Sequence, residues 1–414
     1  MSVQTAPIAL SASAKPATAP VAVPSSIAPV ASAQTGAYTA RLHTALEAIA
    51  PLWRRFETDG AATAYQRLDW TGRVVDHLAG PMRAAPLVVE LVETDTGRQV
   101  MLVPLARVRH RGYRVITWLD LGVCDYAAPL LAPGIDLTSE AMADAWSAIR
   151  KVLPRADLIR ISRIPAEVQG RANPVASLER CRRMEMQASG VAIDGDAATL
   201  LDRLCRPSAR KDMAKMRRRL DRQGEVTFVK ASTAAEVDMI FDALVEQRRS
   251  RFSEMGRFDL LSRPDVEAFY RAGAHEGLSG GPARLFGLSV GGTWIAAAYG
   301  LVHAGTFHGI LLTMAGGAWR NTSPGLHVVA DSMTWARAAG LDYFDFTVGV
   351  MPYKEDFGVQ TRDLDELVEV VTLRGLVVTQ ALRRSEQTKE WLRTHPEWYA
   401  KVQKARRWLR RKAL

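Results

Sequence analysis

The stretch FDFTVGVMPYKEDFGV, residues 344–359, places a tyrosine and a lysine just beyond an apolar strand. Its phenylalanine and valine residues alternate with the period of two that predicts a β-strand, and a glycine and a proline then end that strand. Tyr353 and Lys354 would therefore stand at a strand-to-helix junction. Junctions at the carboxyl edge of a sheet commonly hold the ligand-binding groups of α/β proteins.

Three other side chains in the same half of the sequence could transfer a proton. His308 falls in a predicted strand, His303 stands beside a turn, and Asp345 lies between two phenylalanines. Histidine ordinarily titrates near neutral pH, so His308 is a candidate for the base that deprotonates an acceptor, although a single histidine on a strand is more often structural. Asp345 would face away from the core, where it could orient the acceptor or form an ion pair with Lys354.

The sequence RNTSPGLH, residues 320–327, precedes a helix predicted at residues 325–339. Its asparagine, threonine and serine can cap the helix, its proline suits the first turn, and its glycine allows close approach to the backbone. Free amides at such a start, together with the helix dipole, favour an anion such as a pyrophosphate, although most capped helices bind no ligand. The expected anion-binding residues are Arg320, Ser323, Gly325, Leu326 and His327.

These candidates depend on a repeated order of helices and strands. The first half contains helices at about residues 38–58 and 63–78 with Trp53 and Trp70 as core anchors, a hairpin that turns at 95–97, a helix at 138–153, the strand ADLIRIS, and irregular chain to about 190. The second half contains helices near 195–222, 233–255 and 264–276, then three strands, the helix at 325–339 and the strand from Phe344. This order predicts an α/β protein of layered α+β type, with two tandem domains and mixed, mostly antiparallel sheets.

Composition supports a globular protein of two domains. The 414 residues exceed what one core usually serves, and 48% of them are hydrophobic. The sequence has no secretory signal and no apolar run of 18 residues, so we expect a cytoplasmic protein. Three widely spaced cysteines predict neither a disulfide framework nor a metal site. The expected boundaries are a disordered leader rich in Ala, Ser and Pro at residues 1–36, domains at 37–190 and 191–375, and a tail at 376–414.

Positive charge is concentrated near the C-terminus. The formal net charge of the chain is +10, and residues 383–414 hold eleven Lys or Arg against three Glu, a net of +8. Trp398, Val402 and Trp408 recur at roughly helical spacing, which predicts a basic amphipathic helix. Such a helix suits an anionic membrane surface, at the inner face of the membrane, or an acidic partner such as a synthase complex. A solvated helix that caps the fold explains the pattern equally well.

Several stretches, in this order, make the chain resemble a known family. They are SARKDMAKMRRRLDRQGEVTF at 208–228, SPGLHVVADSMTWARAAGLDYFDF at 323–346 and MPYKEDFG at 351–358, with fainter likeness in YQRLDW at 65–70 and DYAAPLL at 125–131. The chain resembles the GNAT-type acyltransferases of the CelD/BcsL group, which are associated with bacterial cellulose and exopolysaccharide production. More distantly, it resembles the FemAB-type aminoacyltransferases. The resemblance implies two tandem GNAT-like domains, with the acyltransferase in the second.

The resemblance also implies roles for these residues. The pantetheine of acetyl-CoA, a co-substrate, would pair with the strand TFHGILLTM, and its pyrophosphate would meet the helix start at Gly325. In such folds a tyrosine just past the next strand often protonates the departing thiolate, and Tyr353 occupies that position. A tyrosine that only packs its ring would fit there as well. The acetyl group would pass directly to an amine or hydroxyl acceptor, for example on a saccharide.

Two other functions remain open. Many GNAT enzymes carry Q/R-x-x-G-x-G/A at the pyrophosphate turn, whereas this chain has a single glycine after Arg320. A FemAB-like transferase would take its acyl group from aminoacyl-tRNA instead of CoA, and the basic helix at residues 208–222 could hold that RNA. Outside this alternative, we expect no nucleic acid partner. The other alternative is a non-catalytic partner of a polysaccharide synthase.

Overall fold

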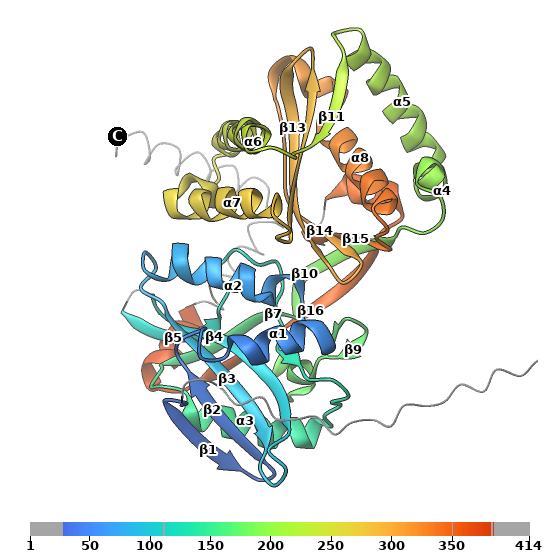
Figure 1. The fold of residues 1–414 in the computed structure, drawn as a ribbon. Helices are drawn as coiled ribbons and strands as arrows, with labels where there is room; N and C mark the ends of the chain where they lie inside the picture. The colour runs from blue at the N-terminus through green and yellow to red at the C-terminus, as the bar shows by residue number, and fades with distance from the viewer. Residues whose placement is uncertain (1–27, 111, 350, 382–383, 385–414) are drawn as a thin grey trace, which may run out of the picture.

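The structure, a computed structural model, describes residues 28–110, 112–349, 351–381 and 384. Most of its strands form one fourteen-stranded sheet that runs through the whole molecule, with helices on both sides (Figure 1). Neighbouring strands follow the order β1-β2-β3-β4-β5-β7-β16-β10-β15-β14-β13-β12-β11, and β6 pairs with β4. All pairs are antiparallel except β5 with β7 and β14 with β15. This mixed architecture confirms the expected fold class.

Each half of the chain repeats one succession of three antiparallel strands, a helix and a parallel strand. In the first half these are β3 (Ala85–Glu93), β4 (Gln99–His110), β5 (Tyr113–Trp118), α3 (Ser139–Val152) and β7 (Leu158–Pro165). In the second half they are β12 (Ala283–Val290), β13 (Thr293–His303), β14 (Thr306–Met314), α8 (Pro324–Ala338) and β15 (Tyr343–Val348). The helix returns the chain across the sheet, which allows the parallel pairing.

Two exchanged strands join the halves. β10 (Cys181–Ala192) follows β7 in the chain but pairs with β15, and β16 (Gln360–Val370) follows β15 but pairs with β7. β10 and β16 also pair with each other. The domain boundary expected between residues 190 and 191 therefore falls inside β10, and the chain expected to be irregular before residue 190 is partly a strand. The first seven residues of β10 carry no buried side chain, so they lack the alternation that predicts a strand.

The described chain begins with a strand where a leader was expected. β1 (Ala31–Thr35) pairs with β2 (Tyr38–His43), so the strand overlaps the leader assigned to residues 1–36. β2 also replaces the start of the predicted helix, and α1 (Ala50–Asp59) begins only at residue 50. Tyr38 and Leu42 are four residues apart, a spacing that fits both a helix face and one face of a strand. Residues 1–27, and the tail at 382–383 and 385–414, lie outside the described residues.

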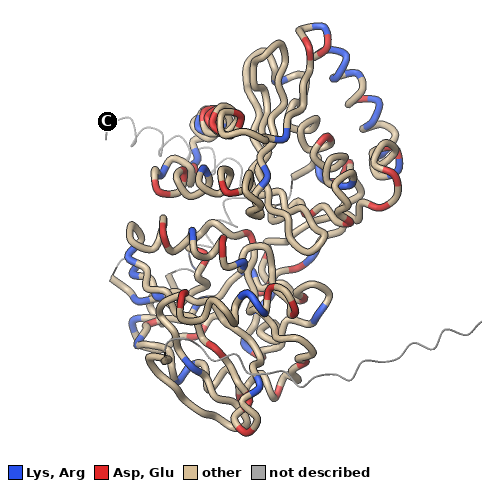
Figure 2. The backbone as a smooth tube through the Cα atoms, in the orientation of Figure 1, with Lys and Arg blue, Asp and Glu red and all other residues tan. Residues whose placement is uncertain are grey.

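Helices cover both faces of the second-half sheet. α6 (Ala234–Glu254) and α7 (Pro264–Gly277) lie on one face, and α8 and α5 (Pro207–Asp221) lie on the other (Figure 1). Lys and Arg gather along α5 (Figure 2). The shorter elements are η1 (Ala64–Gln66), α2 (Leu68–Val74), η2 (Val75–Ala79), β6 (Leu130–Leu131), β8 (Glu167–Val168), β9 (Arg171–Ala172), η3 (Pro174–Ser177), η4 (Ala197–Thr199), α4 (Leu200–Leu204), β11 (Val226–Lys230), η5 (Leu260–Ser262), η6 (Gly317–Thr322) and η7 (Pro352–Phe357). Within the described residues, no helix is both long and apolar enough to cross a membrane.

A buried arginine fixes the two halves to each other. Trp53 and Trp70 are fully buried, as expected. The guanidinium of Arg73 lies 5.6 Å from the centre of the Trp70 ring and 5.7 Å from that of Phe269 on α7, and it pairs with Glu276 at the end of α7. A cation between two aromatic faces gains both electrostatic attraction and packing. This contact holds α2 of the first half against α7 of the second.

Candidate active site

The strands β14 and β15 pair over only three residues and then separate. Parallel pairing joins Thr306–His308 to Tyr343–Asp345. Just beyond it, Ile310 is an extra residue in β14, because its neighbours Gly309 and Leu311 pair with consecutive residues of β13. Bulges of this kind redirect a strand and occur often beside functional sites. We call the opening between the two strands the β14–β15 fork.

Thr347 bridges the fork. Its backbone φ of +58° lies in the left-handed region, which β-branched residues rarely adopt. Its Oγ1 donates a hydrogen bond of 2.9 Å to the carbonyl of Gly309, and its amide donates one of 2.7 Å to Oδ1 of Asp345. Backbone strain that is held in place by such bonds clusters at functional sites. The strain therefore marks the fork as a candidate site.

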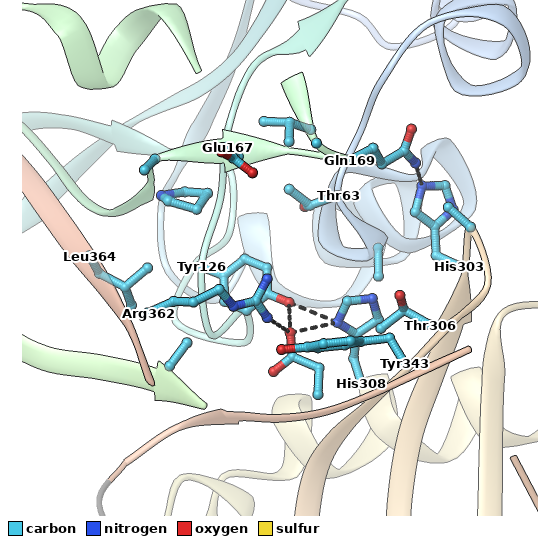
Figure 3. Close-up of a pocket in the computed structure, with 18 of the residues that line it drawn as sticks. Thr63, Tyr126, Glu167, Gln169, His303, Thr306, His308, Tyr343, Arg362 and Leu364 are labelled. Atoms are coloured by element: carbon cyan, nitrogen blue, oxygen red, sulfur yellow. Dashed lines mark hydrogen bonds and ion pairs between the residues drawn. The ribbon is translucent and has the colours of Figure 1, made fainter. Parts of the chain in front are cut away.

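On one face of the fork, three side chains meet the carboxylate of Asp345 (Figure 3). Its Oδ2 accepts hydrogen bonds from the Tyr126 hydroxyl at 2.5 Å and from Nη2 of Arg362 at 2.8 Å, and it lies 3.4 Å from Nδ1 of His308. Nδ1 of His308 is also 2.7 Å from the Tyr126 oxygen. A hydroxyl group has one proton with which to donate. Because the Tyr126 hydroxyl donates its hydrogen bond to the Asp345 carboxylate, the Tyr126 oxygen accepts a hydrogen bond from Nδ1 of His308. The neutral form of His308 is therefore the Nδ1–H tautomer, in which the lone pair is on Nε2.

The surroundings keep Asp345 ionised. Its side chain is 1% exposed, and burial acts to raise its pKa. The hydrogen bond from His308 and the positive charge of Arg362 outweigh burial, so the pKa of Asp345 is lower than its ordinary value. Burial and the charge of Asp345 raise the pKa of Tyr126 well above its ordinary value. Tyr126 thus keeps its proton and stays a donor to Asp345.

A second carboxyl group, Asp125, has the opposite shift. It accepts a hydrogen bond of 3.3 Å from the Tyr65 hydroxyl. Burial raises the pKa of Asp125, and the negative charge of Asp345 adds to the rise, against the positive charge of Arg163. Two nearby carboxyl groups with pKa values shifted in opposite directions are typical of sites that move protons.

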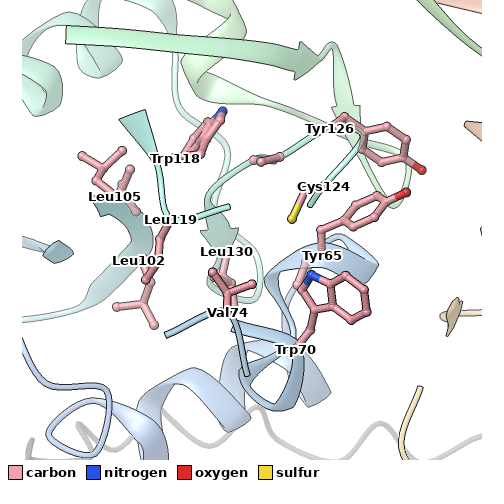
Figure 4. Close-up of a cluster of buried hydrophobic side chains, with 14 of the residues drawn as sticks. Tyr65, Trp70, Val74, Leu102, Leu105, Trp118, Leu119, Cys124, Tyr126 and Leu130 are labelled. Atoms are coloured by element: carbon pink, nitrogen blue, oxygen red, sulfur yellow. The ribbon is translucent and has the colours of Figure 1, made fainter. Parts of the chain in front are cut away.

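Core packing fixes the two tyrosines. The rings of Tyr65 and Tyr126 meet edge to face with centroids 5.1 Å apart, and Tyr65 contacts Trp70 in the same way at 6.3 Å. Figure 4 shows both hydroxyl groups at one edge of a buried cluster that continues through Cys124 and Val74. The first half therefore supplies a rigid wall to a fork that belongs to the second half.

A pocket of about 730 Å³ lies over the Asp345 cluster, between the two halves. Its volume is within the range of small-molecule sites. Its charged residues carry both signs, with four carboxylates against two guanidinium groups: Glu167, Asp345, Asp363, Asp365, Arg183 and Arg362. A pocket with this many donors and acceptors suits a polar ligand.

On the opposite face of the fork, a cavity of about 30 Å³ lies between β14, β15 and α8. Side chains alternate across a strand, so Phe344 and Phe346 line this cavity while Asp345 faces the pocket. Tyr353, on η7, also lines the cavity, and burial raises its pKa to about 12. A cavity of this size holds about one water molecule. A pantetheine arm would therefore need the lining side chains to move.

The corresponding fork of the first half is bridged by its own side chains. β5 and β7 also pair over a short parallel stretch, and Arg163 in β7 has a φ of +61°, as Thr347 does in β15. Nε1 of Trp118 donates a hydrogen bond of 3.1 Å from β5 to the carbonyl of Ser162 in β7. Nη1 of Arg163 donates one of 2.5 Å to the carbonyl of Cys124. The second-half fork is also bridged, by Thr347, and it has a pocket on one face and a cavity on the other.

Lys354 lies beneath the end of β15. Its Nζ is within hydrogen-bonding distance of four consecutive carbonyl groups, at 2.8–3.5 Å: those of Phe346, Thr347, Val348 and Gly349. Burial lowers the pKa of Lys354 to about 8, against the charges of Asp125 and Asp345. Asp345 pairs with Arg362 and His308 instead of forming the expected ion pair with Lys354. Lys354 holds the strand end in place.

The start of α8 differs from the expected anion site. The amides of Leu326 and His327 both donate to the carbonyl of Ser323, at 2.9 and 3.4 Å. Ser323 is the N-cap residue, whose carbonyl accepts the first hydrogen bonds of the helix. The prediction that Leu326 and His327 present free amides is therefore wrong.

Gly325 and the side chain of His327 are buried, and Arg320 pairs with a carboxylate. Gly325 is buried, and a Cβ at this position would lie 3.2 Å from Sδ of Met314. Arg320 is exposed and pairs with Glu254 at 2.9 Å. His327 is buried with Nε2 unbonded, and burial lowers its pKa to about 4.

Among the predicted catalytic residues, only His308 and Asp345 come together. Tyr353 lies on the other face of the fork. His303 lines the pocket, and its Nε2 is 3.0 Å from the carbonyl of Ala62 and 2.8 Å from Nε2 of Gln169. Burial lowers the pKa of His303 to about 4. In the described part of the chain, no three His, Cys, Asp or Glu side chains gather as a metal ion would require.

Sequence reasoning missed Tyr126, Arg362, Thr347 and Asp125. Tyr126 stands 182 residues before its partner His308, and no local pattern relates the two. The one available signal for these two residues is the stretch DYAAPLL, which contains both Asp125 and Tyr126 but bears only a faint resemblance to the family. Arg362 lies on β16, a strand that the sequence analysis did not predict.

A family profile matches the part of the chain that contains the fork. The sequence profile of the acetyltransferase (GNAT) domain matches residues 207–355, just over a third of the chain. The matched segment begins with α5 and ends within η7, so it includes the fork, His308, Asp345 and Tyr353. Tyr126 and Arg362 lie outside it. The chain therefore contains a GNAT-type acetyltransferase domain to which flanking segments contribute part of the pocket.

Solved structures share the fold along most of the chain. A crystal structure of FemX matches with a TM-score of 0.52 and 11% identity, and the match covers 75% of this chain and 94% of that one. A conserved protein of unknown function from Bacteroides thetaiotaomicron VPI-5482 matches with a TM-score of 0.50 and 8% identity, over 78% and 98% of the two chains. L-PGS from Bacillus licheniformis matches with a TM-score of 0.45 and 13% identity, over 80% and 94%. No curated protein sequence matches significantly. At these identities the likeness to FemX and to the Bacteroides protein shows the fold alone.

Proposed function

We propose that the protein is an acyltransferase whose acceptor binds in the 730 Å³ pocket and whose donor carbonyl lies at the β14–β15 fork. The observation that carries this proposal is the fork itself. It borders the Asp345 cluster on one face and the Tyr353 cavity on the other, so a carbonyl placed between the strands would meet groups from both faces. A GNAT-type domain that spans the fork supports the same reaction class.

His308 is the proposed general base. Nδ1 is held by Tyr126 and Asp345, and the lone pair on Nε2 has no hydrogen-bond partner among the described residues, so it is available to an acceptor. An amine or hydroxyl that attacks the donor carbonyl must lose a proton, which Nε2 would take. The ionised Asp345 would then stabilise the imidazolium, directly and through Tyr126. This arrangement resembles the catalytic triads of hydrolases, in which a carboxylate orients the histidine that acts as the base.

Tyr353 is the proposed general acid. With a pKa of about 12, its hydroxyl keeps its proton at neutral pH and can give it to a developing thiolate. It approaches the fork from the face opposite His308, as an acid that protonates the leaving group should. Direct transfer requires no covalent intermediate on the protein.

Acetyl-CoA is the proposed donor, although the fit is partial. The GNAT-type domain favours it. The small cavity and the bonded amides at the start of α8 require that the fork widen and that the phosphates bind elsewhere than at Leu326 and His327. An aminoacyl ester of RNA is the second candidate, because α5 and its C-terminal cap carry four exposed cations with no carboxylate partner among the described residues: Lys211, Lys215, Arg218 and Arg222. Such cations would contact a phosphate backbone.

The proposed acceptor is an amine or hydroxyl on a polar molecule such as a saccharide. The carboxylates and guanidinium groups of the pocket supply the hydrogen-bond partners that a molecule with several hydroxyl groups needs. A role in the production of an extracellular polysaccharide, as enzyme or as a non-catalytic partner of a synthase, would be consistent with that acceptor.

Thiol release from acetyl-CoA tests the proposal. The protein is incubated with acetyl-CoA and with amino sugars, neutral sugars or polyamines, and free thiol is measured with and without each acceptor. Release that depends on an acceptor and is lost in His308→Ala supports the proposal. Calorimetric titration with acetyl-CoA and with RNA separates the two donors, and absence of binding by both supports a non-catalytic role.

A further inference from the structure

The helix that follows β16 exposes its apolar side. Residues 373–381 are helical. Leu373 is 84% exposed and Val377 is 61% exposed, whereas Gly375 and Thr379 are buried. Leu373, Leu376 and Val377 recur at the spacing of one helix face, so the usual arrangement, with leucine and valine inside and small or polar residues outside, is reversed.

Contacts at the start of this helix fix that orientation. The amides of Val371 and Thr372 both donate to the carbonyl of Asp157, and Oγ1 of Thr372 lies 3.0 Å from Oδ1 of Asp157. A Cβ at Gly375 would lie 1.9 Å from the same carbonyl oxygen. Only glycine therefore fits against β7 at this position, and rotation of the helix to bury Leu373 would break the contact. The exposed apolar face is built into the fold.

This face continues into the end of β16. Eleven large hydrophobic side chains are exposed in the described part of the chain, and five of them lie within eight residues: Val370, Val371, Leu373, Leu376 and Val377. We call these five residues the apolar ridge. Single exposed hydrophobic residues are ordinary, but a contiguous group usually marks a surface that another body covers.

Positively charged side chains lie next to the apolar ridge. Val371 lines a groove of about 380 Å³ together with Arg150, Lys151 and Arg155 from the end of α3 and the loop after it. Arg374 is exposed within the ridge itself. Of these cations, Arg150 pairs with the buried Glu369 at 3.1 Å. The sequence beyond the ridge, residues 383–414, carries a net charge of +8 and three tryptophans.

We propose that the apolar ridge docks the protein on an anionic lipid bilayer. Exposed leucine and valine next to lysine and arginine is the pattern of surfaces that lie in the membrane interface, where apolar side chains enter the headgroup region and cations meet lipid phosphates. The positive charge of residues 383–414 would be repelled by the cations that line the groove. An anionic lipid surface therefore matches this charge better than the groove does.

Vesicle sedimentation tests this docking surface. The full chain is mixed with vesicles of phosphatidylcholine alone or with a third of phosphatidylglycerol, and the bound fraction is measured at low and high salt. Binding should require phosphatidylglycerol and weaken as salt rises. The double variant Leu373→Asp/Val377→Asp should bind vesicles at least about tenfold more weakly than the wild type, because both charged side chains would have to leave water on docking.

Matched variants make the result decisive. Met239 is 50% exposed on α6, away from the ridge, so Met239→Asp should bind as the wild type does. Circular dichroism and melting temperature should be unchanged in all variants. Failure of the full chain to bind, equal binding by Leu373→Asp/Val377→Asp, or an equal loss in Met239→Asp would each overturn the proposal. A change of oligomeric state in Leu373→Asp/Val377→Asp without vesicle binding would instead assign the ridge to a second copy of the chain.

Discussion

Oγ1 of Thr347 donates a hydrogen bond of 2.9 Å to the carbonyl of Gly309, and this bond joins β15 to β14 just beyond their last paired residues. Thr347 adopts a left-handed backbone conformation, with a φ of +58°, as it makes the bond. The bond and the strain belong together, because a regular β15 would continue to pair with β14 and leave no fork.

The strain at Thr347 predicts an unusual order of stability. In an ordinary strand, alanine is more stable than glycine by roughly 0.5–1 kcal/mol. Thr347→Ala loses the hydrogen bond and keeps the strain, whereas Thr347→Gly loses the bond but removes a left-handed penalty of about 1–2 kcal/mol. We expect the alanine variant to be the less stable of the two in urea unfolding. If glycine is the less stable, as in other strands, the backbone at Thr347 is not strained.

His308 and Tyr126 should affect turnover differently. His308→Ala removes the proposed base, and general base catalysis is typically worth about 10²–10⁴-fold in kcat. Tyr126→Phe keeps the base but removes its link to Asp345, so we expect a smaller loss in kcat with KM unchanged. His303→Ala is the matched control, since His303 lines the same pocket and is already bonded to Ala62. An equal loss in His303→Ala and His308→Ala would remove His308 as the base.

Tyr353→Phe separates acid catalysis from packing. The variant keeps the ring and deletes only the hydroxyl group, so donor binding and melting temperature should hold while kcat falls by about 10²–10⁴-fold. Hydrolysis of acetyl-CoA by water also expels the thiolate and can serve as the assay before an acceptor is known. Hydrolysis at the wild-type rate in Tyr353→Phe would show that another group protonates the thiolate.

Lys354 should give stability a specific pH dependence. Its pKa is about 8 in the fold, below the ordinary value of 10.5, so between these values the unfolded chain binds more protons than the folded chain. Free energy of unfolding therefore rises with pH in this window and does not respond to Lys354 below it. Lys354→Met should be less stable at pH 7, because four carbonyl groups lose their donor, and the difference from wild type should widen from pH 8 to 10.5. A difference that narrows over this range would contradict the low pKa.

Local sequence patterns predicted the repeated elements well. The hairpin at residues 95–97, the helices α3, α6, α7 and α8, and the strands β12 to β15 all carry clear periodicity and turn residues, and they appear where expected. The candidates His308, Asp345 and Tyr353 followed from these strands. Residues that share one strand or one junction could thus be found from sequence alone.

Parts of the site that depend on strand exchange could not be predicted. Tyr126 and Arg362 reach Asp345 only because β10 and β16 each cross to the other half of the chain, and pairing between distant strands has no local signature. The expected phosphate site failed for a different reason. Proline and glycine at the start of α8 predicted free amides, but the carbonyl of the N-cap residue Ser323 accepts hydrogen bonds from two of them.

Binding of acetyl-CoA to Gly309 variants tests the central claim that the donor enters the β14–β15 fork. Gly309 lines the cavity of about 30 Å³, and a Cβ there would meet its nearest neighbour at 3.7 Å, so Gly309→Ala adds volume to the fork without a clash and Gly309→Val adds more. Calorimetric titration should show affinity that falls from wild type to alanine and by more than tenfold, or about 1.4 kcal/mol, in valine, with melting temperatures close to wild type. Equal affinity in all three proteins, or a wild type that does not bind acetyl-CoA, would contradict the account.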